Sequence, residues 1–110
     1  MAKGLLGKIM TVANDFVQAH IVAANADSAV LTVDLENTGP AGEDAVCEIF
    51  FSTSSTPGPL DRVAKAVVIA DGGHFELSCK LASPGERVIV KSPTANVAVR
   101  VSGIESIPTP

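Results

Sequence analysis

Two histidines and two cysteines are the side chains of this sequence that could bind a metal or act as nucleophiles. His20, Cys47, His74 and Cys79 together supply the ligand types of a two-cysteine, two-histidine zinc site. Structural zinc sites hold such ligands at short, defined spacings, and the separations here match no finger or ribbon pattern. We interpret the histidines as incidental residues on the polar faces of strands, and we predict no metal site and no cofactor.

The two cysteines fall on the apolar faces of two predicted strands. A free cysteine in that position behaves as a small buried hydrophobic residue. Cys47 and Cys79 could instead form a disulfide if facing strands bring their Cα atoms within about 7 Å. Because we expect synthesis in a cytoplasm, where thiols stay reduced, we favour two buried thiols and leave the disulfide as the alternative.

The acidic and hydroxyl residues form no catalytic or ion-binding motif. Asp34 and Glu36 alternate with apolar residues, so they belong to the solvent-facing side of a strand, and Glu43 and Asp44 lie in a loop. A calcium loop needs a denser acidic run. The sequence also lacks the Gly-x-Ser-x-Gly motif of serine hydrolases and a glycine-rich loop for phosphates. We predict no catalytic residues and a protein that is not an enzyme.

Composition and charge limit the classes of partner that this chain can bind. The 110 residues carry a net charge of −4, and 46% of them are hydrophobic, which indicates one globular domain over residues 1–110. The basic residues are scattered and there is no Trp or Tyr, which disfavours a nucleic-acid partner. Gly7 and Lys8 interrupt the apolar stretch at the start of the chain, so this stretch is too short for the apolar region of a signal peptide. No apolar run approaches the length of about 18 residues that a membrane span needs, and we expect a soluble chain without a membrane partner.

Alternating apolar and polar residues predict an all-β fold. Such alternation is typical of strands that bury one face, and it is clearest where Leu31, Val33 and Leu35 alternate with polar residues. The expected strands cover residues 5–12, 16–23, 31–36, 45–52, 63–69, 74–81, 87–91 and 97–102. About eight strands at this spacing predict a single antiparallel β-sandwich, Ig-like or jelly-roll-like.

Two local expectations accompany this prediction. The last three strands are separated by short turn signals, which predicts an antiparallel meander between Gly72 and Glu105, with a hairpin turn at Asp71–Gly73 before it. Residues 63–69 also fit helical spacing, but the run Val67-Val68-Ile69 favours a strand.

Four segments of the chain resemble a known group of proteins. They are Leu6-Gly7-Lys8, residues 49–57 (IFFSTSSTP), residues 83–92 (SPGERVIVKS) and residues 96–105 (NVAVRVSGIE). In content and order they are similar to segments of small structural proteins of tailed bacteriophages, and the resemblance covers most of the chain.

The resemblance implies a β-sandwich module of the virion that is made in the host cytoplasm. The first expectation is a head decoration or cement protein, or a head fibre, which binds the major capsid protein or other virion proteins as a homo-oligomer, with a trimer as the expected state. A tail or baseplate component is the alternative within this class. A free ligand-binding, adhesin-like sandwich module is the alternative from another class.

The two ends of the chain, residues 1–10 and 104–110, are candidate extended arms that contact a partner. The apolar residues of the first end are Leu5, Leu6, Ile9 and Met10, and the second end carries Ile107. The first end also fits an ordinary first strand whose side chains enter the core. The prolines that follow Ile107 prevent the second end from extending a sheet.

Overall fold

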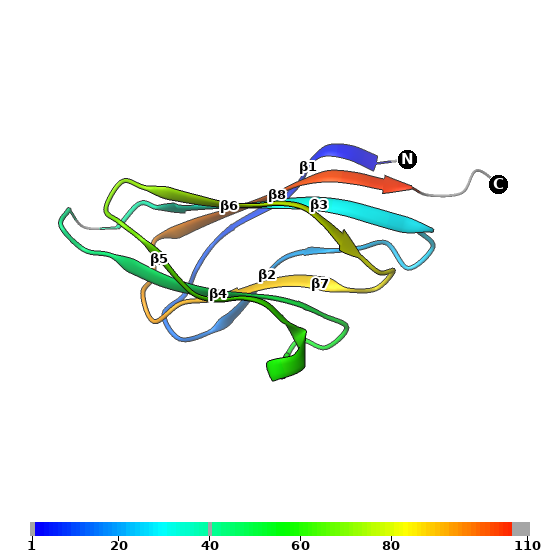
Figure 1. Cartoon of the computed structure of the whole chain (residues 1–110). Coiled ribbons are helices and arrows are strands. Elements are labelled where there is room, and N and C mark those ends of the chain that lie inside the picture. Colours follow the sequence, from blue (N-terminus) through cyan, green and yellow to red (C-terminus); the bar gives the residue numbers. More distant parts are fainter. Residues whose placement is uncertain (1, 40, 107–110) are drawn as a thin grey trace.

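The computed structural model, which describes residues 2–39 and 41–106, consists of two four-stranded antiparallel sheets packed face to face (Figure 1). Its elements are β1 (Ala2–Met10), β2 (Phe16–Ile21), β3 (Ser28–Asn37), β4 (Ala45–Ser52), the 3₁₀ helix η1 (Pro59–Asp61), β5 (Arg62–Ile69), β6 (His74–Ala82), β7 (Arg87–Lys91) and β8 (Val97–Ser106). The predicted antiparallel β-sandwich of about eight strands is confirmed. The strand interpretation of residues 63–69 is confirmed as well, because they belong to β5.

The order of the strands shows which kind of sandwich this is. One sheet has the order β1-β8-β3-β6 and the other has the order β2-β7-β4-β5. The pairs β1–β8, β2–β7, β3–β6 and β4–β5 are nested in the sequence, as in one long antiparallel hairpin. The additional pairs β3–β8 and β4–β7 form where this hairpin rolls up on itself. This arrangement is a jelly roll, which decides between the two kinds of sandwich that the sequence left open.

The expected meander of the last three strands is wrong. The strands β6 and β8 lie in one sheet, separated by β3, and β7 lies in the other sheet. The turn at Asp71–Gly73 is likewise no hairpin, because it carries the chain from β5 in one sheet to β6 in the other. Alternation of apolar residues shows that a strand has one buried face, but it does not show with which strand it pairs.

The core lies between the two sheets and is built from the inward side chains of alternate residues. On β3 these are Leu31, Val33 and Leu35, each with no exposed surface. The inward residues of the other central strands include Cys47, Ile49, Val88, Val90, Val97, Val99 and Val101. Burying one such aliphatic side chain stabilises the fold by about 1.5–3 kcal/mol, so β-branched residues and leucine supply most of the packing.

A β-bulge in β6 changes which side chains of that strand face the core. Leu31 pairs with Lys80 and Val33 pairs with Leu77, so two residues, Ser78 and Cys79, lie opposite Thr32. Cys79 takes a left-handed backbone conformation there, with φ of 54°. A bulge of this kind shifts the alternation by one residue. After it, Ala82 faces the core and Leu81 faces outward.

The edge strands β1 and β2 approach each other closely at Gly7. A Cβ atom at this position would collide with the backbone carbonyl of Ala19 on β2. Both strands shift register at this point, between Leu5 and Gly7 on β1 and between Gln18 and His20 on β2. The absence of a Cβ atom at Gly7 and the irregularities in both strands allow the two sheets to meet along this edge.

Candidate functional site

The predicted contact segment at the start of the chain is strand β1, which pairs with β8 along its length. Its apolar side chains divide between two environments. Leu5 and Met10 are about half exposed, at 48% and 47%, whereas Leu6 packs against the core. Ile9 lies opposite the buried Val99 and is 38% exposed. Ile107 lies outside the described residues. The segment is therefore a strand of the sandwich, with part of its apolar surface turned outward.

The outer side of the β1-β8-β3-β6 sheet, which we call face A, carries a row of exposed apolar side chains. Val30 on β3 pairs with Leu81 on β6 and with Ile104 on β8. Leu81 is 78% exposed, Ile104 47% and Val30 38%. No described element lies over this face (Figure 1). Alternation from the buried Leu31 predicts the outward direction of Val30, but the outward direction of Leu81 depends on the bulge.

The outer side of the β2-β7-β4-β5 sheet, which we call face B, also exposes apolar residues. Val46 on β4 and Val68 on β5 are cross-strand neighbours and are 38% and 63% exposed. Leu60 in η1 is fully exposed. Elsewhere on this face Phe16 and Phe50 pack edge to face, with ring centroids 5.6 Å apart. Apolar side chains are thus presented to solvent on both outer faces.

The two cysteines lie in different environments, and both thiols are free. Cys47 is fully buried on β4, where burial raises the pKa of its thiol and a hydrogen bond with Ser92 acts against that rise. Cys79 is exposed, and its backbone N–H donates to Oγ1 of Thr32 at 3.3 Å. The expectation that both cysteines lie on buried faces is wrong for Cys79, because the bulge turns it outward.

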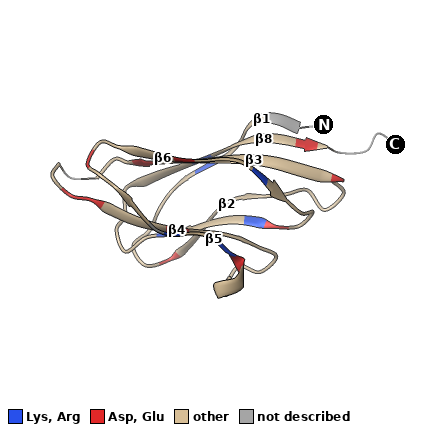
Figure 2. Ribbon diagram, viewed as in Figure 1, with Lys and Arg blue, Asp and Glu red and all other residues tan. Residues whose placement is uncertain are grey.

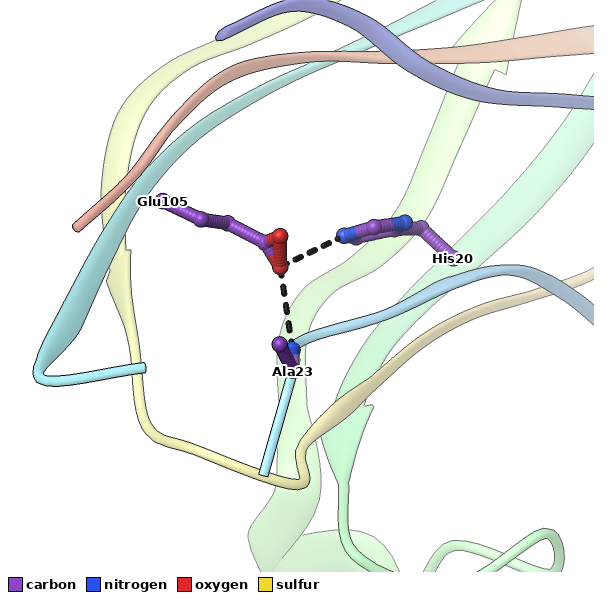
Figure 3. A network of polar contacts seen from close by, with 3 residues as sticks. All are labelled: His20, Ala23 and Glu105. Carbon is purple, nitrogen blue, oxygen red and sulfur yellow. Dashed lines mark hydrogen bonds and ion pairs between the residues drawn. The ribbon is translucent and has the colours of Figure 1, made fainter. Parts of the chain in front are cut away.

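A buried carboxylate connects the two sheets at the end where β2 and β8 finish (Figure 3). Oε1 of Glu105 on β8 accepts a hydrogen bond from the backbone N–H of Ala23 at 3.0 Å and lies 3.1 Å from Nε2 of His20 on β2. The side chains of Glu105 and His20 are only 4% and 13% exposed. His20 is therefore not the incidental polar-face residue that the sequence suggested. The alternation that buries Val99 and Val101 also directs Glu105 inward, and this was the available signal.

The remaining buried polar side chains serve the fold. Asn37 donates to the carbonyls of Glu43 and Ile69 at 2.8 and 3.1 Å, and Thr11 bonds to the backbone of Thr94 and Val97. Within residues 2–39 and 41–106, every buried side-chain nitrogen or oxygen has a hydrogen-bond partner. Native interiors pair their polar groups in this way, so these groups have structural roles.

Comparison of this chain with known proteins finds no relative. No family model, curated protein or solved structure matches the sequence.

The surface offers shallow hollows. One of about 350 Å³ on face A is lined by Asp34, Glu36, His74 and Arg100 together with Leu35 and Ala98. Acidic and basic positions are spread over both sheets and their connecting loops (Figure 2). The described part of the chain contains no group of three or more His, Cys, Asp or Glu residues placed to hold a metal ion. None of the helical segments in that part is long and apolar enough to cross a membrane.

Proposed function

We propose that this chain is a capsid decoration protein of a tailed bacteriophage, which binds the major capsid protein on the head shell and stabilises the shell. One observation carries the proposal: the sandwich exposes apolar side chains on both of its outer faces, at Val30, Leu81 and Ile104 on face A and at Val46 and Val68 on face B. Exposed apolar surface of this kind is characteristic of protein–protein contacts.

Two opposite contact faces suit a module that sits between neighbours. One face can bind the shell while the other binds a second copy or another virion protein, and the resemblance implies a homo-oligomer on the particle with a trimer as the expected state. The buried polar side chains of the described residues are all paired, and fully paired polar groups favour a rigid interior, which suits a part that holds other subunits in place.

The fold and the resembling segments add support of different kinds. Jelly rolls recur in viral capsid and lectin domains, but a fold by itself does not fix a function. The segments 83–92 and 96–105 contain β7 and most of β8, and residues 49–57 contain the end of β4. The resemblance therefore involves central strands of both sheets.

Copy number in the virion tests the proposal. Virions of the phage that encodes this chain would be purified and the chain quantified by mass spectrometry against the major capsid protein. Decoration of the head predicts hundreds of copies per particle. A few to tens of copies would instead support a tail or baseplate component. Absence from the particles would overturn a virion role and favour the free ligand-binding module, for which the hollow lined by Asp34, Glu36, His74 and Arg100 is the candidate site.

A further inference from the structure

Four charged residues form one row across face A. Asp34 on β3 lies directly opposite Glu76 on β6 and directly opposite Arg100 on β8, and Arg100 in turn lies opposite Lys8 on β1. Glu76, Arg100 and Lys8 are exposed and Asp34 is half-buried. Across the sheet from β6 to β1, the row therefore reads two negative charges followed by two positive charges.

This order of charges is unfavourable within the single chain. Like charges directly opposite each other on neighbouring strands destabilise a sheet. The row contains two such pairs, Glu76–Asp34 and Arg100–Lys8, on either side of one pair of opposite charges, Asp34–Arg100. Within residues 2–39 and 41–106, neither the salt bridge Arg62–Glu48 nor the contact between His20 and Glu105 includes a member of the row. A surface that keeps two repulsive pairs side by side is suited to meeting the opposite charges of a partner.

We propose that face A binds face A of a second copy of this chain, with a twofold axis that runs along the strands between β3 and β8. Rotation about this axis keeps each residue at the same height along the strands. It places the acidic half of the row in one copy over the basic half of the row in the other. Asp34 then faces the second copy's Arg100, and Glu76 faces the second copy's Lys8. Each copy supplies both contacts to the other, so the interface holds four pairs of opposite charges.

Two of the three residues of the apolar row, Val30 and Ile104, are compatible with the same rotation. Val30 and Ile104 are cross-strand partners on the two central strands of the sheet. Val30 of each copy therefore faces Ile104 of the other copy. A twofold axis across the strands at the height of the charged row would instead place Asp34 against Asp34 and Arg100 against Arg100. The charge pattern therefore selects one axis, and the contact is self-complementary, as a twofold interface must be.

The size of face A indicates a weak contact. Strands lie about 4.8 Å apart, and outward-facing rows recur every second residue, about 6.8 Å along the strands. Four strands and four outward-facing rows therefore make a surface of about 500 Å² per copy. Specific stable interfaces bury about 800 Å² per partner, and smaller ones are transient. We expect a dissociation constant on the order of 10–100 µM.

This inference deepens the homo-oligomer of the proposed function, since face B remains free for the shell. It predicts a dimer in solution instead of the trimer that the resemblance implies. The dimer is tested on the isolated full-length chain, whereas the virion role is tested by copy number in particles, so the failure of one is distinguishable from the failure of the other.

The experiment is sedimentation of the full-length chain over a range of concentrations, with charge-exchange variants. An acid-row variant carries Lys8→Glu and Arg100→Glu, and a base-row variant carries Asp34→Lys and Glu76→Lys. The native chain is expected to approach twice its monomer mass of 11.2 kDa. Each variant alone is expected to associate at least about tenfold more weakly, because every substitution acts twice in a twofold interface. An equimolar mixture of the two variants is expected to restore the dimer.

Control variants distinguish the effect of the charged row on association from the effects of net charge and of misfolding. The single substitutions Arg100→Glu and Asp34→Lys are measured beside Lys65→Glu and Asp44→Lys, which make the same changes of charge at exposed residues away from face A. Lys65→Glu and Asp44→Lys are expected to leave the dimer intact, whereas Arg100→Glu and Asp34→Lys are expected to weaken it. Circular dichroism should show that all variants are folded. The restored dimer in the mixture would support the proposal. A native chain that stays monomeric at about 1 mM, a trimer, or row variants that dimerise as well as the native chain would each overturn it.

Discussion

Nε2 of His20 lies 3.1 Å from Oε1 of Glu105, and this contact joins β2 of one sheet to β8 of the other. The same oxygen accepts the backbone N–H of Ala23. A carboxylate buried between sheets is tolerated only when hydrogen bonds and a partner replace its water. The pair therefore acts as a link between the two sheets at the end where the strands β2 and β8 finish.

Replacing Glu105 by Ala should lower the free energy of unfolding by about 1–3 kcal/mol, because the N–H of Ala23 and the ring of His20 lose their acceptor. Glu105→Gln keeps an oxygen acceptor at the same place and should cost less. Urea denaturation of the three proteins measures the difference. Equal losses for Ala and Gln would show that the hydrogen bond to Ala23 does not contribute.

Neighbouring residues of β8 should respond in opposite ways to substitution. Val99 is fully buried and Arg100 is exposed. Val99→Asp places an unpaired carboxylate in the core and should destabilise the fold by several kcal/mol. Arg100→Ala should change stability by no more than about 0.5 kcal/mol. Thermal melts at low protein concentration compare the two, and similar effects would contradict the register of β8.

Strand β1 offers a second neighbouring pair. Leu6 packs against the core while Leu5 points outward and is half exposed. Leu6→Ser should lower stability by about 1–2 kcal/mol, and Leu5→Ser by no more than about 0.5 kcal/mol. Deleting residues 1–10 removes the partner of one side of β8 and should prevent stable folding. A deletion variant that melts at the native temperature would show that the segment is dispensable to the sandwich.

The two thiols should differ in reactivity. Cys79 is exposed and should react with a thiol reagent at once, whereas Cys47 is fully buried and should react only as the protein unfolds. Because burial raises the pKa of Cys47, the unfolded chain loses this proton at a lower pH than the folded chain. Its contribution to stability should therefore be complete below the ordinary thiol pKa and should be lost as the pH rises through the higher folded value. Counting the modified thiols with time, with Cys79→Ser as the control, tests the difference in reactivity. Simultaneous reaction of Cys47 and Cys79 would contradict it.

The sequence predicted the strands well because each central strand buries one face. The alternation of Leu31, Val33 and Leu35, and of Val97, Val99 and Val101, leaves one choice of buried face. Pairing was harder to predict. The turn at Asp71–Gly73 has the residues of a hairpin, but the strands on either side of it pair with β4 and β3, and only the rolled topology decides this.

The contact surface was predicted less well, for a local reason. The bulge at Ser78 and Cys79 moves Leu81 from the expected buried face to face A. No glycine marks this bulge, since Cys79 itself takes the left-handed conformation. The charged row was also hidden in the sequence, because Lys8, Asp34, Glu76 and Arg100 come together only through the pairing of four strands.

Binding to the phage head tests the account most directly. Heads assembled without this chain would be mixed with the purified protein, and both the bound amount and the melting temperature of the shell would be measured. The account predicts saturable binding at hundreds of sites and a higher melting temperature, with binding reduced when Val46 and Val68 of face B are replaced by Ser. Heads that bind no protein and melt at an unchanged temperature would contradict the proposed role.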